Sequence, residues 1–212
     1  ESGARGRAEA MLRWIKFSAR PAFTRRTHTE ARLAALGYEL PELPKPAGSY
    51  TLGVPHAGWI HLAGHLPFKS DMKSVHVGVV GRDYTAEEAE ELAKITGLEL
   101  IASLKKAVGD LDKVKRIVKI NGYIACDPSF TALPAVLNGC SNLLGEVFEE
   151  RGVHARAAVG VVSLPLGVPI EIDLVAQYGV TTWPRSEPSP PPPASPSTPH
   201  LPPPPNYNTF AD

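Results

Sequence analysis

Residues 154–178 read HARAAVGVVSLPLGVPIEIDLVAQY, and this stretch decides the fold class. Residues 157–162 and 170–178 are two runs rich in apolar and β-branched side chains, a composition that predicts two strands. Between them, Leu-Pro-Leu-Gly at 164–167 predicts a turn, since proline and glycine both favour turn conformations. A strand, a turn and a second strand therefore close the globular part of the chain.

Upstream of this stretch, three more runs predict strands and one motif predicts a helix. The runs are residues 59–65, 74–80 and 114–125, and the first two are expected to be neighbours in one sheet. Thr-Ala-Glu-Glu at 85–88 has the form of a capping box, in which two side chains satisfy free backbone N–H groups at the start of a helix. We expect this helix to end at Gly109.

Glycine and proline indicate how the first expected helix packs and where a second helix begins. Gly97 in the first helix costs ~1 kcal/mol relative to alanine, so we expect it to mark close packing against the sheet. Asp127 followed by Pro128 predicts the N-cap and the first position of a second helix that continues through Val147. The order strand, strand, helix, strand, helix, strand, strand predicts an α+β fold with two helices on one face of a mixed sheet.

The composition indicates one globular domain without a dominant charge. Of 212 residues, 43% are hydrophobic, which suits one well-buried domain with appendages. Lys plus Arg equals Asp plus Glu at 22 each, so no overall field would attract nucleic acid or an acidic membrane surface. No apolar run approaches the ~20 residues that span a membrane. The only cysteines, Cys126 and Cys140, argue against a disulfide framework and fit a reducing compartment.

The two ends differ from the middle and divide the chain into three segments. Residues 1–38 carry more Arg and Lys than Glu, as is typical of the flank of a removed organellar targeting segment; a shortened chain is the alternative. We expect a mitochondrial protein, with a cytoplasmic location as the alternative. Residues 39–180 form the globular domain. Residues 181–212 are rich in proline, so we expect this tail and the basic extension to dock on neighbouring proteins, the alternative being flexible spacers.

Four motifs occur in order: Gly-Ser-Tyr at 48–50, Gly-His-Leu-Pro at 64–67, His-Ala-Arg-Ala-Ala-Val at 154–159, and Leu-Pro followed by Ile-Glu-Ile-Asp at 164–173. Together they resemble the RidA/YjgF family. Residues 134–144, PAVLNGCSNLL, are similar to its endoribonuclease L-PSP/chorismate-mutase-like subgroup. The resemblance implies a chorismate-mutase-like fold, a homotrimer whose sheets form a central barrel, and three clefts between subunits. In typical members the activity is hydrolysis of reactive enamine and imine intermediates to 2-oxo acids and ammonia.

Arg156 and Glu171 are the first candidates for catalysis. A guanidinium on a rigid strand offers a planar fork of donors that matches a carboxylate, as capture of a 2-imino acid would require. Glu171 could position or activate the water that attacks the imine carbon. The alternative for both residues is a structural ion pair across the trimer interface.

Further site residues follow from the resemblance. Tyr50 is the third catalytic candidate, through its hydroxyl and ring, although it could also be a loop anchor. Gly64 would let the substrate approach a bare backbone N–H, and Ala158 and Asn138 complete the expected substrate-binding positions. Ala158 stands where active deaminases often have Cys, and Ala63 where they often have Ser or Thr. Two polar contacts of the family are therefore missing.

The histidines indicate no metal site. His154, two residues before Arg156, could act as an acid or base near neutral pH, although a hydrogen-bonded structural role is favoured. His61, His65 and His76 lack the pairing that zinc ligands show. We expect neither a metal nor another cofactor.

Three functions compete on this evidence. A small-molecule hydrolase of the RidA type is favoured by a narrow margin. The alternative is a catalytically silent RidA-like fold that serves as a structural subunit of a larger organellar assembly, which the missing polar contacts and the two long termini support. RNA cleavage ranks third, because the charge is neutral and basic runs interleaved with aromatic residues are absent.

Overall fold

The structure is a computed structural model that describes residues 29–46 and 48–179. The segments before residue 29 and after residue 179 lie outside the described residues, and with them lie the expected targeting flank and most of both expected docking arms. The helices and strands are α2 (Thr29–Ala35), β1 (Gly53–His56), β2 (Trp59–His65), α3 (Ala86–Val108), β3 (Val114–Ala125), α4 (Leu133–Phe148), β4 (Ala155–Val161) and β5 (Ile170–Tyr178). None of the helices described is long and apolar enough to cross a membrane.

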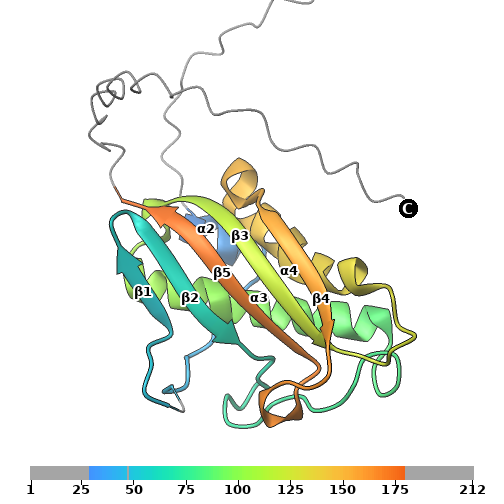
Figure 1. The fold of residues 1–212 in the computed structure, drawn as a ribbon. Coiled ribbons are helices and arrows are strands. Elements are labelled where there is room, and N and C mark those ends of the chain that lie inside the picture. Colours follow the sequence, from blue (N-terminus) through green and yellow to red (C-terminus); the bar gives the residue numbers. More distant parts are fainter. Residues whose placement is uncertain (1–28, 47, 180–212) are drawn as a thin grey trace, which may run out of the picture. The chain divides into compact units, whose positions relative to one another are not determined.

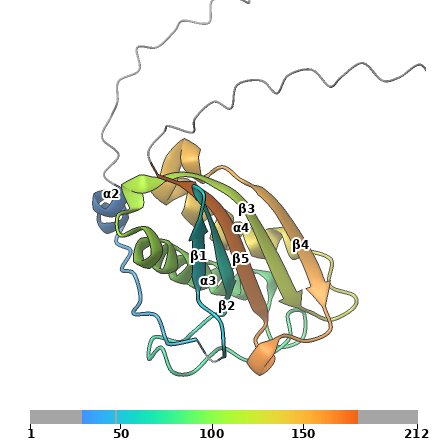
Figure 2. The same cartoon turned by 60° about the vertical axis from the view of Figure 1, so that its left-hand side comes forward.

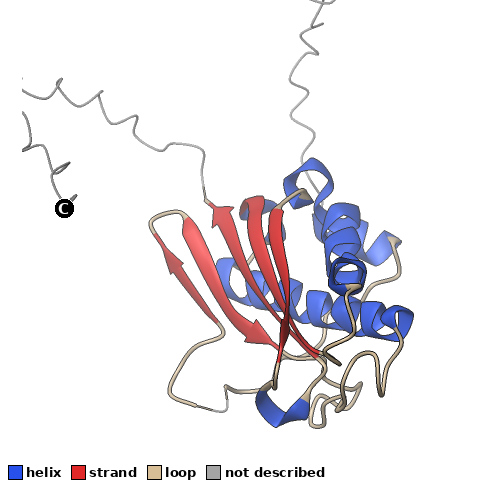
Figure 3. Ribbon diagram, turned by 45° about the vertical axis from the view of Figure 1, so that its right-hand side comes forward, coloured by secondary structure: helices blue, strands red, loops and turns tan. Residues whose placement is uncertain are grey.

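Five strands form one mixed sheet in the order β1-β2-β5-β3-β4 (Figure 1). The β3 and β4 strands are parallel, and the other neighbouring pairs are antiparallel. Helices α3 and α4 cover one face, and Figure 3 shows the helices on a single side of the sheet. The predicted α+β class with two helices on one face is confirmed, and the strands expected at 59–65, 114–125 and 170–178 have the predicted bounds.

Helix α3 begins and ends where the sequence predicts. The hydroxyl of Thr85 accepts the N–H of Glu88 at 3.2 Å, and the carboxylate of Glu88 accepts the N–H of Thr85 at 2.8 Å. Gly109, with φ of 79°, follows its last residue. The expected partner of Gly97 is wrong: a Cβ there would lie 2.9 Å from Cδ2 of Leu143. Gly97 therefore allows α3 to approach α4, not the sheet.

The strand expected at residues 74–80 is a loop. Val75 and Val80 make isolated bridges only, because the segment has no extended partner along its length. Gly78 has a φ of 146°, and its N–H donates to the carbonyl of Gly167 at 3.0 Å. The place beside β2 belongs to β1, which contains Pro55. Proline lacks an N–H donor and is tolerated in β1 because that strand lies at the edge.

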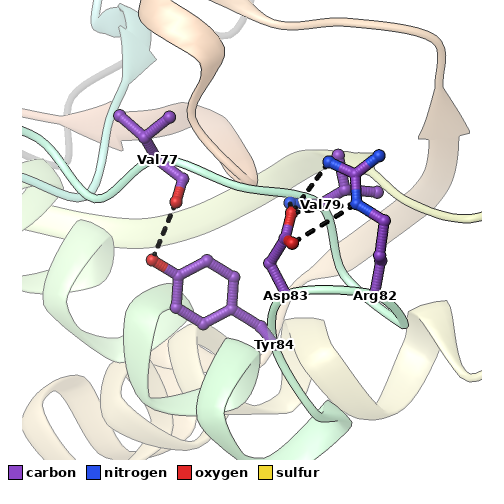
Figure 4. Close-up of polar contacts among 5 residues, drawn as sticks. All are labelled: Val77, Val79, Arg82, Asp83 and Tyr84. Carbon is purple, nitrogen blue, oxygen red and sulfur yellow. Dashed lines mark hydrogen bonds and ion pairs between the residues drawn. The ribbon is translucent and has the colours of Figure 1, made fainter.

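Side chains beyond this loop hold it in place, as Figure 4 shows. The hydroxyl of Tyr84 donates to the carbonyl of Val77 at 3.1 Å. The carboxylate of Asp83 accepts the N–H of Val79 at 2.8 Å and forms an ion pair with Arg82 at 2.9 Å. The loop is thus fastened to the residues that lead into α3.

The predicted start of the second helix is also wrong. Helix α4 begins at Leu133, and Asp127 instead accepts the N–H and the hydroxyl of Ser129, at 2.9 and 2.5 Å. Asp127 therefore closes a turn, a competing use of the same side chain. Pro134, in the first turn of α4, has the role expected of Pro128.

Helix α2 lies within the segment assigned to the N-terminal extension and was not predicted. The N–H and hydroxyl of Thr29 both donate to Asp112, at 2.8 and 2.6 Å, and Arg151 donates to the Thr29 hydroxyl at 2.8 Å. Leu33 reaches the core. These partners are distant in sequence, so no local pattern signals the helix.

Candidate functional site

Arg156 lies on the edge strand β4 and points toward α4. Its Cα pairs with Ile120, a fully buried core residue, which places both on the helix-covered face. Nη1 donates to Oγ of Ser141 at 3.0 Å, and Nη2 donates to the carbonyl of Pro134 at 3.2 Å. Arg156 is exposed, and it forms no ion pair with any described carboxylate. Its remaining N–H groups are therefore available to an anion.

Ser141 connects Arg156 to His154. Nδ1 of His154 lies 2.6 Å from the carbonyl oxygen of Gly152 and so carries the hydrogen, because a carbonyl can only accept. Nε2, 3.2 Å from the Ser141 hydroxyl, is left as an acceptor. Burial lowers the pKa of His154, and the charge of Arg156 lowers it further. A neutral His154 thus orients Ser141, which orients Arg156.

Asn138 and Ala158 lie on the same side as this chain of hydrogen bonds. Asn138 follows Pro134 by one helical turn and precedes Ser141 by one, so the three share a face of α4. Ala158 follows Arg156 by two residues on β4 and packs against the core. We call Arg156, Asn138, Ser141, His154 and Ala158 the arginine half-site.

Glu171 lies on the opposite face of the sheet. Its neighbours on β5, Ile170 and Ile172, are fully buried on the helix side, so Glu171 points to the opposite face, which no described helix covers and which we call the uncovered face. A Cβ at Gly64 would overlap the Glu171 carboxyl group, which therefore lies directly over the Gly64 backbone. Burial raises the pKa of Glu171, and the charge of Asp173 raises it further. We call Glu171 and Gly64 the glutamate half-site.

Tyr50 lies in the bend before β1, with 55% of its surface exposed. Strand β1 forms the other edge of the sheet from β4, four strand spacings or ~19 Å away. Within one chain, then, Tyr50 and Arg156 do not share a site. Arg156 and Glu171 do not share one either, because they face opposite sides of the sheet.

A hollow of about 560 Å³ lies beside the arginine half-site. Leu133, next to the Pro134 whose carbonyl binds Arg156, lines it together with Gly160 of the same strand as Arg156. Cys126 also lines it, and burial raises the pKa of that thiol, so it is not activated as a nucleophile.

Nowhere in residues 29–46 and 48–179 do three His, Cys, Asp or Glu side chains come together as metal ligands could.

Ser141 is a site residue that was not predicted. It lies in the run 134–144, and its position seven residues after Pro134 indicates that both share a helix face. That this face meets Arg156 depends on the pairing of β4 with β3, which no local pattern reveals.

Comparison with known proteins gives consistent matches over the described part of the chain. The family model described as "YjgF/chorismate_mutase-like, putative endoribonuclease" matches residues 30–178. Protein TCP17 of Trypanosoma cruzi is 40% identical over 148 residues, which are 69% of this chain and 92% of that protein. The crystal structure of Atu1372 from Agrobacterium tumefaciens, a protein described as of unknown function, is 37% identical with a TM-score of 0.66, over 71% of this chain and 92% of that one. A "putative endoribonuclease" from Shewanella oneidensis is 32% identical with a TM-score of 0.68, over 70% and 98%.

Proposed function

Because the chain belongs to the YjgF/chorismate mutase-like family, we propose that it hydrolyses reactive enamine and imine intermediates whose carboxylate binds Arg156. The observation that supports this most directly is the state of the Arg156 guanidinium. It is fixed by Ser141 and Pro134 at 3.0 and 3.2 Å, yet it is exposed and has no carboxylate partner among the described residues. A pre-oriented fork with free donors is suited to bind a carboxylate.

The complete site lies between two copies of the chain in this proposal. Since Arg156 and Glu171 face opposite sides of one sheet, only a second copy can bring a glutamate half-site to an arginine half-site. The uncovered face also exposes large apolar side chains, and their burial would favour association. These are Val54, Trp59 and Val159, exposed by 51%, 39% and 44%. A homotrimer with one cleft per interface is the expected assembly.

The reaction needs one water and one proton carrier. With the substrate carboxylate on Arg156, Glu171 takes a proton from water as the oxygen attacks the imine carbon. Glu171 passes this proton to the nitrogen, which gives a carbinolamine. It then takes the hydroxyl proton and gives it to the nitrogen as the carbon–nitrogen bond breaks, and a 2-oxo acid and ammonia leave. A raised pKa, which burial and Asp173 give Glu171, suits a group that must accept and return a proton near neutral pH.

The test is an assay on freshly generated 2-imino acids. Arg156→Lys should lose most activity, because an ammonium cannot reproduce the fork. Glu171→Gln should bind a carboxylate ligand yet turn over slowly. Glu91→Gln, which removes an exposed carboxylate from α3, is the matched control and should act as the wild type. Wild-type activity in both site variants would remove Arg156 and Glu171 from the mechanism.

Association is measured separately by light scattering on the full chain. A trimer at micromolar concentration is expected. A stable monomer would contradict the shared site even if hydrolysis were observed.

A second candidate function is a catalytically silent subunit of a mitochondrial assembly. It is favoured by Ala63 and Ala158, which supply no polar group beside Gly64 and Arg156. In this case the segments 1–38 and 181–212 would dock on neighbouring proteins. Deleting 181–212 should then weaken assembly and leave self-association unchanged, and no imino acid should be hydrolysed.

A further inference from the structure

A groove of about 1070 Å³ lies apart from both half-sites, none of whose residues lines it. Its floor is helix α3. One wall is the segment from Glu39 to Lys45, which Figure 2 shows descending beside α3 between α2 and β1. The other wall is the loop from Phe68 to His76. Apolar side chains line much of the groove: Leu43, Phe68, Met72, Ile95 and Leu98.

Glu99 projects from α3 into this groove and is only 2% exposed. One carboxyl oxygen, Oε1, accepts the N–H of Phe68 at 3.1 Å. The other, Oε2, accepts no hydrogen bond from the described residues, although none of their fully buried side-chain oxygens lacks a partner. Oε2 is therefore the part of the carboxyl group that borders the groove.

No cation of the described chain neutralises this carboxyl group. Lysines line the groove, but none forms an ion pair with Glu99, and the charge of Lys69 acts on His76 instead. Glutamine would accept the N–H of Phe68 equally well without the cost of burying an acid. A carboxyl group at this position is thus suited to something that an amide cannot do, which is to pair with a positive charge.

We propose that the groove binds a small molecule that carries an ammonium group on an apolar body. Binding releases the proton that burial keeps on Glu99. The ammonium then donates to Oε2 and supplies the missing positive charge, in surroundings where a charged hydrogen bond is stronger than in water. The apolar body packs against Ile95 and Leu98 on the floor of the groove. This site does not depend on the function proposed for Arg156.

Calorimetric titration of the full chain with 2-phenylethylamine tests the proposal. 2-Phenylethanol, which replaces the ammonium by a neutral group, is the comparison ligand for the wild type. 3-Phenylpropionate, which replaces it by an anion, is titrated into Arg156→Ala, because Arg156 is proposed to bind carboxylates. The amine should bind about tenfold more tightly than the comparison ligand in each protein, a typical difference for a charged hydrogen bond. Glu99→Gln should lose this preference while remaining folded, as judged by its unfolding temperature.

Two control variants locate the site. Glu91→Gln removes a carboxylate from the exposed side of α3 and should bind the amine as the wild type does. Arg156→Ala should also bind it unchanged. Equal amine binding by Glu99→Gln, tighter binding of the carboxylate than of the amine by Arg156→Ala, no saturable binding of the amine to the wild type, or loss of amine binding in Arg156→Ala would each overturn the proposal.

Discussion

Replacing Glu99 by glutamine should stabilise the folded chain relative to the wild type, and this gain should increase as the pH rises. Burial raises the pKa of Glu99 to about 8 from an ordinary value of 4.5. The folded state therefore holds a proton that the unfolded state releases. The stabilisation from this proton is complete below pH 4.5, is lost progressively as the pH rises, and is gone above about pH 8.

The size of the effect follows from the shift. A rise from 4.5 to about 8 corresponds to about 5 kcal/mol, at ~1.4 kcal/mol per pKa unit. Hydration of Oε2 through the groove reduces this figure, so about 2 to 5 kcal/mol is expected above pH 8. Glutamine does not titrate, and its carbonyl oxygen can still accept the N–H of Phe68.

The assay is urea unfolding of wild type and Glu99→Gln between pH 5 and pH 9. The variant should gain free energy of unfolding relative to the wild type with increasing pH, up to the difference above. Other titrating groups are common to both proteins and cancel in the comparison. Glu91→Gln should follow the wild type throughout. If the free energies of unfolding of wild type and Glu99→Gln changed in parallel with pH, folding would not raise the pKa of Glu99 and the prediction would be wrong.

Three further substitutions test the fold and the site. Thr85→Ala removes the hydroxyl that accepts the N–H of Glu88, while the backbone N–H of residue 85 can still donate to the Glu88 carboxylate; the change should cost about 1 kcal/mol in urea unfolding, and an unchanged free energy would contradict the cap. Gly64→Ala must displace the Glu171 carboxyl group, so imine hydrolysis should fall about tenfold or more with little change in the unfolding temperature; full activity would remove Glu171 from the site. Gly139→Ala places a Cβ against the backbone carbonyl of Glu90 and should lower the free energy of unfolding by about 1 to 3 kcal/mol; wild-type stability would mean that α3 and α4 can separate without cost.

Local chemistry made much of the fold predictable. The capping box at Thr85 and the glycine at 109 act within one helical turn, and the structure has both. Strands β2, β3 and β5 are long enough for their apolar pattern to define their bounds. The errors arise where the partner is distant in sequence. Residues 74–80 have the pattern of a strand, but whether a segment pairs depends on which edge of the sheet is free.

Glu99 was missed although the sequence carried a signal for it. The apolar stripe of α3 includes Leu92 and Leu100, and the polar residues Thr96, Glu99 and Ser103 recur along it at helical spacing. All three are buried. The hydroxyl of Thr96 donates to the carbonyl of Leu92 at 2.9 Å, and Ser103 pairs with His65 at 2.5 Å. An acidic residue in such a stripe predicts a buried carboxyl group, but the groove above it requires the tertiary structure.

The separation of Arg156 from Glu171 follows from the order of the strands. The turn at Pro165–Gly167 joins β4 to β5, yet these strands are not neighbours, because β3 lies between them, parallel to β4 and antiparallel to β5. In the β3 ladder Arg156 is level with Ile120 on the covered face, whereas Glu171 is level with Tyr123 on the open face. A shift of one residue in either register would reverse one of these directions. The spacing between the two residues therefore cannot build a site within one chain. If both residues act on one substrate, Arg156 of one copy and Glu171 of another must meet where the two copies are in contact. A substitution that prevents association should therefore abolish hydrolysis while leaving each half-site intact.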